Sequence, residues 1–266
     1  MLALLRHSLR MLCNVKLVAL HLVVNGVLLV SASFWLLIPE AHIWQLLFAA
    51  LTALLIIAML LWLHSGTFVY ALAPAKEFFQ LSFAIKIWRM FWLLLGTFLL
   101  LWSMNTVGSW MDSRWQIAGY LYSKSPVWLR PTAGSDSYTT VLEYLLLVLY
   151  WYVIPSVVFA ITAARICGAN FLRGLRILKH WQYWLGMAIT ALVGVWATKL
   201  ILEWMPGKTL TQQTVSMIIR LAIVYLIATA AWLLTAGVIG YFVKLNLPAT
   251  GIIMPNNSNM IGQTGS

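Results

Sequence analysis

Two histidines inside long apolar runs are the first residues whose chemistry needs an explanation. His21 lies about one turn into the first run, and His64 lies roughly two turns from the end of the second. Ionisable side chains are costly inside a bilayer, so each is a functional hypothesis by default. Two imidazoles at similar depth on antiparallel neighbouring helices could hold a haem or relay protons. The interpretation we favour is structural, with each ring hydrogen-bonded to a neighbour such as Asn25 or Ser65 and no cofactor bound.

A second group of ionisable residues lies near the junction of the fifth and sixth apolar runs. Lys199 and Glu203 are four residues apart, so they can pair on one helix face. Arg220 could join them across the helix interface. One interpretation is a polar vestibule that is open to the outside and admits an anionic ligand. The favoured interpretation is side chains that reach the membrane surface, together with an interfacial salt bridge.

Motifs that carry catalysis or bind metals are missing from the sequence. There is no G-x-S-x-G, H-E-x-x-H, P-loop or D-x-D pattern, and no Asp lies in a long apolar run. No nucleophile is accompanied by a base and an orienting group. Cys13 and Cys167 form no CxxC pair and have no His at zinc spacing. The sequence therefore argues against an enzyme and against a metal site.

Composition places these residues in a membrane. The 266 residues are 62% hydrophobic and 9% charged, with a mean hydropathy of +0.90. Soluble domains contain about 25% charged residues, so this chain cannot cover a soluble surface. The net charge of +11 lies in short loops, where it sets orientation and meets anionic headgroups rather than nucleic acid.

Six uncharged apolar runs predict six transmembrane helices, because a span needs about 20 residues. We expect an all-α integral membrane protein with one domain over residues 1–244 and a polar, disordered cytoplasmic tail over 245–266. An outer loop is predicted over 110–140. The predicted spans are about 17–38, 44–70, 90–109, 142–164, 181–203 and 218–242.

Local signals refine the ends of these helices. Pro74 marks the end of the second run, and Pro155 predicts a kink in the fourth helix. Two segments match a capping box, in which a hydroxyl and a carboxyl or amide satisfy orphan backbone groups. They are Thr140–Glu143, which would start the fourth helix and account for Glu143, and Thr209–Gln212 before the sixth.

Lys and Arg predict that both termini are cytoplasmic in a plasma (inner) membrane, because bases concentrate on the cytoplasmic side. With the N-terminus inside, eleven bases fall inside and six fall outside, which accounts for all 17. The inner bases are Arg6, Arg10, Lys16, Lys76, Lys86, Arg89, Arg165, Arg173, Arg176, Lys179 and Lys244. The outer bases are Arg114, Lys124, Arg130, Lys199, Lys208 and Arg220.

Three similar segments precede the first, third and fifth spans and suggest a threefold repeat. They are residues 8–12, 84–88 and 174–178, and each reads small, aliphatic, basic, aliphatic, large apolar. We expect interfacial amphipathic helices there, each followed by a transmembrane hairpin, with bases facing anionic headgroups. An ordinary membrane entry from the cytoplasm would produce the same pattern. The headgroup-facing bases would be Arg6, Arg10, Lys86, Arg89, Arg173, Arg176 and Lys179.

In outline the chain resembles the permease half of ABC-type polysaccharide or drug exporters, in its length, its six spans and its amphipathic N-terminal segment. That resemblance would imply an ATPase partner. We nevertheless expect a non-catalytic scaffold or assembly component, because no continuous path of ionisable groups crosses the spans. The first alternative is a permease subunit with a water-filled cavity lined by Asn25, Asn105, Thr106 and the Lys199 group. The second is an electron carrier with a haem between two histidines.

Overall fold

The structure is a computed structural model that describes residues 1–39, 42–74, 76–128, 130, 134–204, 206–207 and 209–246. Within these residues the chain forms helices joined by turns, with no strand. The last helix continues to Asn246, two residues into the predicted tail of 245–266, and the rest of that tail lies outside the described residues. The helices are α1 (Leu2–Cys13), α2 (Val15–Trp35), α3 (Ile43–Leu72), α4 (Phe78–Phe83), α5 (Ile87–Asp112), α6 (Arg114–Lys124), α7 (Ser135–Val148), α8 (Ile154–Ile166), α9 (Phe171–Ile177), α10 (Trp181–Ala191), α11 (Thr198–Glu203) and α12 (Leu210–Asn246).

Six helices among the described residues are long and apolar enough to cross a membrane, which confirms the number predicted from the sequence. They are α2, α3, α5, the continuous α7–α8, the continuous α10–α11, and α12. The fourth and sixth begin earlier than predicted, at Ser135 and Leu210. Much of the predicted outer loop is therefore helical, because α6 also lies within it.

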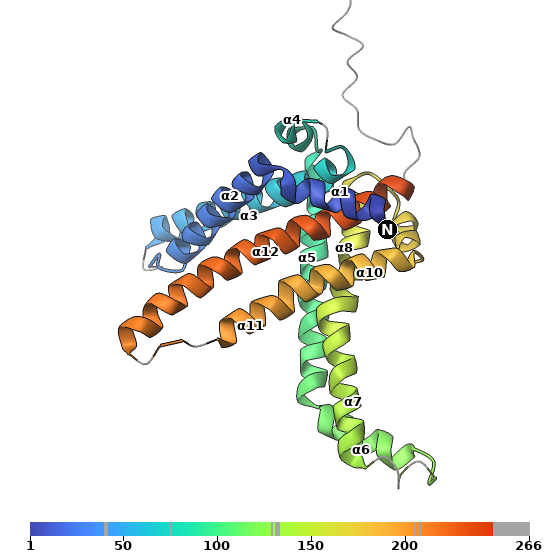
Figure 1. Cartoon of the computed structure of the whole chain (residues 1–266). Helices are drawn as coiled ribbons and strands as arrows, with labels where there is room; N and C mark the ends of the chain where they lie inside the picture. Colours follow the sequence, from blue (N-terminus) through green and yellow to red (C-terminus); the bar gives the residue numbers. More distant parts are fainter. Residues whose placement is uncertain are drawn as a thin grey trace, which may run out of the picture.

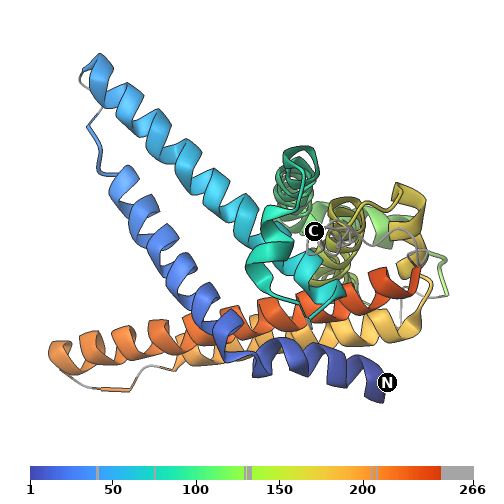
Figure 2. The same cartoon turned by 90° about the horizontal axis from the view of Figure 1, so that it is seen from above.

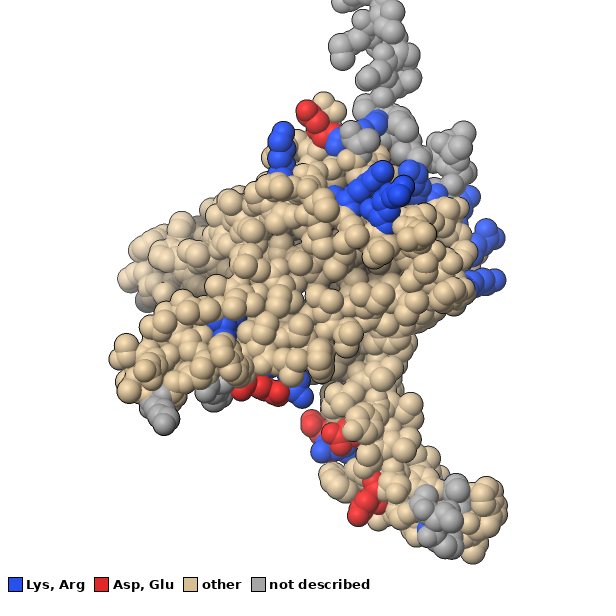
Figure 3. Space-filling model, viewed as in Figure 1, with Lys and Arg blue, Asp and Glu red and all other residues tan. Residues whose placement is uncertain are grey.

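The six spans form three hairpins, α2/α3, α5/α7–α8 and α10–α11/α12, and a short helix precedes each of them. The hairpins meet where α1, α4 and α9 lie and separate toward their tips (Figures 1 and 2). We call the shared end the basic end, because most Lys and Arg gather there (Figure 3). The predicted five-residue repeat does not fall on equivalent elements. Residues 8–12 and most of 174–178 lie on α1 and α9, whereas 84–88 joins α4 to α5.

The hydrophobic core lies in the half of the molecule next to the basic end. It contains the last third of α3, the end of α8 and the end of α12, with residues such as Phe68, Ile166 and Phe242 almost fully buried. The rest of α3 is mostly exposed. In its first half, Ala49 is the one buried residue. The outer halves of the hairpins therefore present apolar side chains to their surroundings.

Small residues let the helices approach one another at the basic end. A Cβ atom at Gly240 of α12 would lie 2.5 Å from the Cβ of Ala71 on α3. One at Gly237 would lie 2.8 Å from the Cα of Ser8 on α1. Lipid chains are as apolar as the side chains, so helices in a bilayer associate through such close packing and through hydrogen bonds between them. These contacts hold α12 between α1 and α3.

Two π-helical turns interrupt the fourth and fifth spans, at Leu149–Val153 and Leu192–Ala197. The first ends two residues before Pro155, where the sequence predicted a kink. Pro has no N–H and crowds the preceding turn, and a π turn accommodates both effects. The departure from regular α-helix, which is the π turn, therefore lies on the N-terminal side of Pro155.

One of the two predicted capping boxes is wrong and the other is confirmed. Thr140 lies inside α7, where its hydroxyl donates to the carbonyl of Asp136 at 2.9 Å. Glu143 is instead paired with Arg114, with 3.6 Å between Oε2 and Nε. The Thr209 and Gln212 side chains each accept from the other's backbone N–H, both at 3.3 Å. Hydroxyl spacing alone did not reveal that the fourth helix begins at Ser135.

We expect Gly240→Ala to destabilise the protein, because its methyl group would meet the backbone and Cβ of Ala71. Overpacking of this kind costs about 1–3 kcal/mol, which outweighs the gain of about 1 kcal/mol in helix propensity. Thermal unfolding in detergent, followed by tryptophan fluorescence, measures the change in Tm. Gly108→Ala is the matched control, because no atom lies within 4 Å of its added Cβ. A Tm for Gly240→Ala at or above that of the control would contradict the packing.

Candidate functional site

The candidate site is a cleft at the basic end, where α1 lies across the end of α12. One face of α1 is buried, through Leu4, Ser8 and Met11. A second face exposes apolar side chains at helical spacing, Leu2, Leu5 and Leu9. A third carries the exposed side chains of Arg6 and Arg10, with His7 half-buried beside them. Because residues three or four apart share a helix face, α1 has a packed, an apolar and a basic side.

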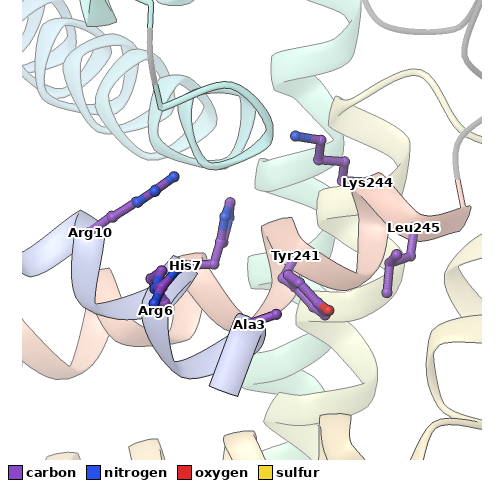
Figure 4. Close-up of a pocket in the computed structure, with 7 residues that line it drawn as sticks. All are labelled: Ala3, Arg6, His7, Arg10, Tyr241, Lys244 and Leu245. Carbon is purple, nitrogen blue, oxygen red and sulfur yellow. The ribbon is translucent and has the colours of Figure 1, made fainter. Parts of the chain in front are cut away.

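Two adjoining cavities open beside the basic face of α1. The first, about 530 Å³, is lined by α1 and the end of α12, including Arg6, Tyr241 and Lys244. The second, about 660 Å³, extends to the end of α3. His7, Arg10 and Lys244 line both cavities, so we treat them together as the basic cleft. In Figure 4 the side chains of His7 and Arg10 rise from α1 toward the side on which Lys244 leaves α12.

Hydrogen bonds hold the walls of the basic cleft in place. His7 Nε2 lies 2.8 Å from the carbonyl oxygen of Ala71, which joins α1 to α3. Asn14 Nδ2 donates to the hydroxyl of Tyr70 at 2.6 Å, and that hydroxyl donates to the carbonyl of Pro74 at 3.0 Å. Burial lowers the pKa of His7, and the positive charges of Lys244 and Arg10 lower it further, against the effect of its backbone hydrogen bond. The imidazole therefore lies in a positive field.

The charge of the cleft is not balanced by nearby acids. No Asp or Glu is found among the described residues that line either cavity. The ion pairs of the described chain are Arg114–Glu143 and Lys199–Glu203, both in the part of the molecule remote from the cleft. Arg6, Arg10 and Lys244 thus line one cavity that has no carboxylate among its described lining residues. Such an arrangement is suited to binding an anion.

The two intramembrane histidines do come together, as expected. The rings of His21 and His64 lie 5.9 Å apart between centroids. His21 Nε2 is 2.8 Å from the Thr67 hydroxyl oxygen, and that hydroxyl donates to the carbonyl of Leu63 at 2.7 Å. Nε2 of His21 therefore donates its own proton to Thr67. The expected neighbours Asn25 and Ser65 are not the partners of this ring.

The hydrogen bond expected for a structural role is present at one nitrogen of the histidine pair. The donating Nε2 of His21 has no lone pair for a metal, whereas the Nδ1 atoms of His21 and His64 are buried and have no hydrogen-bond partner among the described residues. His64 packs edge-on against Trp232 at 4.8 Å. In the described part of the chain, no group of three or more His, Cys, Asp or Glu side chains is placed to hold a metal ion.

The cluster near the tip of the third hairpin is only partly as expected. Lys199 and Glu203 are paired, with 3.6 Å between Nζ and Oε1, and both side chains are more than 60% exposed. Arg220 is buried and reaches α11, but its Nη1 donates to the carbonyl of Leu202 at 2.7 Å. The guanidinium therefore satisfies a helix-terminal carbonyl.

The residues of the predicted transport path lie on three different hairpins. Asn105 lines a cavity of about 460 Å³ between α5 and the first π turn, together with Ser109, Asp112 and Tyr150. Asn25 lies on α2 in the first hairpin. The Lys199 group lies in the third hairpin, so the expected lining residues are divided among three hairpins.

The remaining predicted headgroup-facing bases occupy different elements. Arg173 and Arg176 lie on α9, and Lys179 follows it. Lys86 caps α5 and Arg89 lies in its first turn, so neither belongs to an interfacial helix. They share the basic end with the cleft but do not line it. Among the residues that line the cleft, His7 and Lys244 carry its chemistry but were not among the predicted site residues. The i, i+1, i+4 spacing of Arg6, His7 and Arg10 on α1 was the available signal.

Comparison with known proteins finds no matching family model, no matching curated protein and no matching solved structure. The functional argument therefore depends on the geometry of this chain.

We expect Arg220→Met to lower the Tm more than Lys199→Met does. A hydrogen bond from a charged donor contributes about 1.5–3 kcal/mol, whereas an exposed ion pair four residues apart contributes about 0.3–0.5 kcal/mol. At about 2–4 °C per kcal/mol, thermal unfolding in detergent separates the two variants. Equal shifts would show that Arg220 does not stabilise the contact between α11 and α12.

Proposed function

We propose that this chain is a non-catalytic, multi-pass scaffold of the plasma (inner) membrane, with both termini cytoplasmic. The observation that supports it is the position of the core. The three hairpins pack together at the basic end, whereas their outer halves separate and expose apolar side chains (Figures 1 and 2). Outer halves of this kind must be covered by lipid or by other membrane helices. A protein whose three hairpins are joined at the basic end and separated elsewhere is suited to organise neighbouring membrane proteins.

The distribution of charge supports this orientation. The bases of α1, α9 and the ends of α5, α8 and α12 lie at the basic end. The acids Asp112, Asp136, Glu143 and Glu203 lie near the hairpin tips or on α7. Because Lys and Arg concentrate on the cytoplasmic side, the basic end would face the cytoplasm. We further propose that each short helix and its following hairpin form one of three related units.

Membrane-impermeant maleimide added to intact cells tests the orientation. Native Cys13 is exposed at the basic end and should stay unlabelled until the cells are opened. In a variant lacking both native cysteines, Ser125→Cys at the end of α6 should be labelled from outside. Labelling of Cys13 but not of position 125 in intact cells would reverse the proposed orientation.

Site-specific photo-crosslinking tests the scaffold role. A benzoylphenylalanine in place of Phe48 on α3 or Trp102 on α5, both exposed in the outer halves of their hairpins, should give a discrete adduct with one and the same polypeptide in native membranes. Tyr120 on α6, which is at least as exposed and lies outside the spans, is the matched control position. Adducts with lipid alone at both positions would argue against a scaffold.

A permease subunit is the second candidate function, and the cavity beside Asn105 favours it. Tyr150 and Trp151 of the first π turn line this cavity, and π turns are frequent at functional sites. In the maleimide experiment, a scaffold predicts that Asn105→Cys is protected by lipid. A permease predicts that it is labelled from outside at a rate similar to that of Ser125→Cys.

A further inference from the structure

We propose that the basic cleft is a discrete site for one phosphate group, carried on the headgroup of a membrane lipid. This inference deepens the proposed function by naming the ligand class of the scaffold's cytoplasmic end. It differs from a general attraction of basic residues to anionic membranes, because it assigns binding to one cleft and not to the other bases of the same end.

The first support is the convergence of cations from distant parts of the chain. Arg6 and Arg10 come from α1 and Lys244 from α12, and all three line the first cavity. The described lining residues contain no carboxylate to neutralise them. Bringing like charges together beside apolar surface is unfavourable unless an anion completes the site. Phosphate suits such a site, because Arg and Lys donate charge-assisted hydrogen bonds to its several oxygens.

The second support is the rigidity of the cleft. The hydrogen bond between His7 and Ala71 joins α1 to α3, and the close approach at Gly237 joins α1 to α12. The basic groups are therefore carried on packed helices rather than on a flexible loop. A binding site whose walls are already in place loses little conformational entropy when it binds its ligand.

The third support is the exposed apolar face of α1, which favours a lipid as the source of the phosphate. Leu2, Leu5 and Leu9 are 84%, 53% and 42% exposed, and they lie beside the arginine face of the same helix. A helix of this kind lies in the interface, with its apolar side toward acyl chains and its bases at the level of the headgroups. The acyl chains of a lipid could follow the leucine face while its phosphate enters the cleft.

The test uses the full-length protein in a neutral detergent and measures binding by native mass spectrometry and by the rise in Tm. The probe is dioctanoyl phosphatidic acid, and dioctanoylglycerol is the same molecule without the phosphate. We expect one copy of phosphatidic acid to bind with saturation and no comparable binding of dioctanoylglycerol. Glycerol 3-phosphate and inorganic phosphate test whether a soluble phosphate is sufficient.

The decisive comparison is between two double variants that remove the same charge from the same end. Arg10→Gln with Lys244→Gln alters the cleft, whereas Arg176→Gln with Lys179→Gln alters bases on and after α9 that do not line it. The cleft variant should bind phosphatidic acid at least about tenfold more weakly, which corresponds to the loss of one charge-assisted contact. The α9 variant should bind nearly as the native protein does.

Equal weakening in both double variants, or binding without saturation, would overturn the proposal in favour of diffuse attraction. Binding of glycerol 3-phosphate as tight as that of phosphatidic acid would overturn the lipid as the source. If the cleft variant does not fold, Lys244→Gln alone serves in its place, because Lys244 is exposed. The assay in detergent requires neither an orientation nor a partner protein, so its failure is distinguishable from failure of the scaffold.

Discussion

The close approach of helix backbones at the basic end is the contact on which the rest of this structure depends. Apolar side chains gain little from leaving lipid for one another, so the six spans cannot rely on burial to hold them together. Gly237 and Gly240 let α12 lie directly against α1 and α3. A hydrogen bond from the Tyr225 hydroxyl to the carbonyl of Leu22 adds a link between α12 and α2. Where such contacts end, the hairpins separate.

This arrangement divides the molecule into two structural regions. Near the basic end, short helices, the N-terminus and most bases lie around a tightly packed core. Toward the tips, each span contacts mainly its own hairpin partner. Polar side chains there bond to groups about one turn away on the same helix. Thr106 donates to the carbonyl of Trp102 one turn earlier, and Lys199 pairs with Glu203 on the same helix. The proposed ligand site therefore lies at the packed end, and the proposed contacts with other membrane components lie on the separated hairpins.

The basic cleft follows from the same packing. Because Ser8 fits against Gly237, α1 is drawn onto the end of α12, and its basic face is brought next to Lys244. The pKa of His7, lowered by burial and then by its cationic neighbours, is a consequence of that proximity. A larger residue at position 237 would move α1 away and would widen the cleft. The proposed phosphate site and the stability of the hairpin junction therefore depend on the same contact between α1 and α12.

Sequence patterns that extend over neighbouring residues were sufficient to predict the number of spans and some of the local contacts of this protein. Six uncharged runs predicted six spans because the thickness of a bilayer sets their length, and the Lys199–Glu203 pair and the Thr209–Gln212 cap followed from the geometry of one helical turn. Some contacts between residues far apart in the sequence were not predicted correctly or not predicted at all. The partner of His21 is Thr67, and the cleft joins Arg10 to Lys244. Only tertiary structure decides such contacts, because they depend on which helices meet and on how each is rotated about its axis.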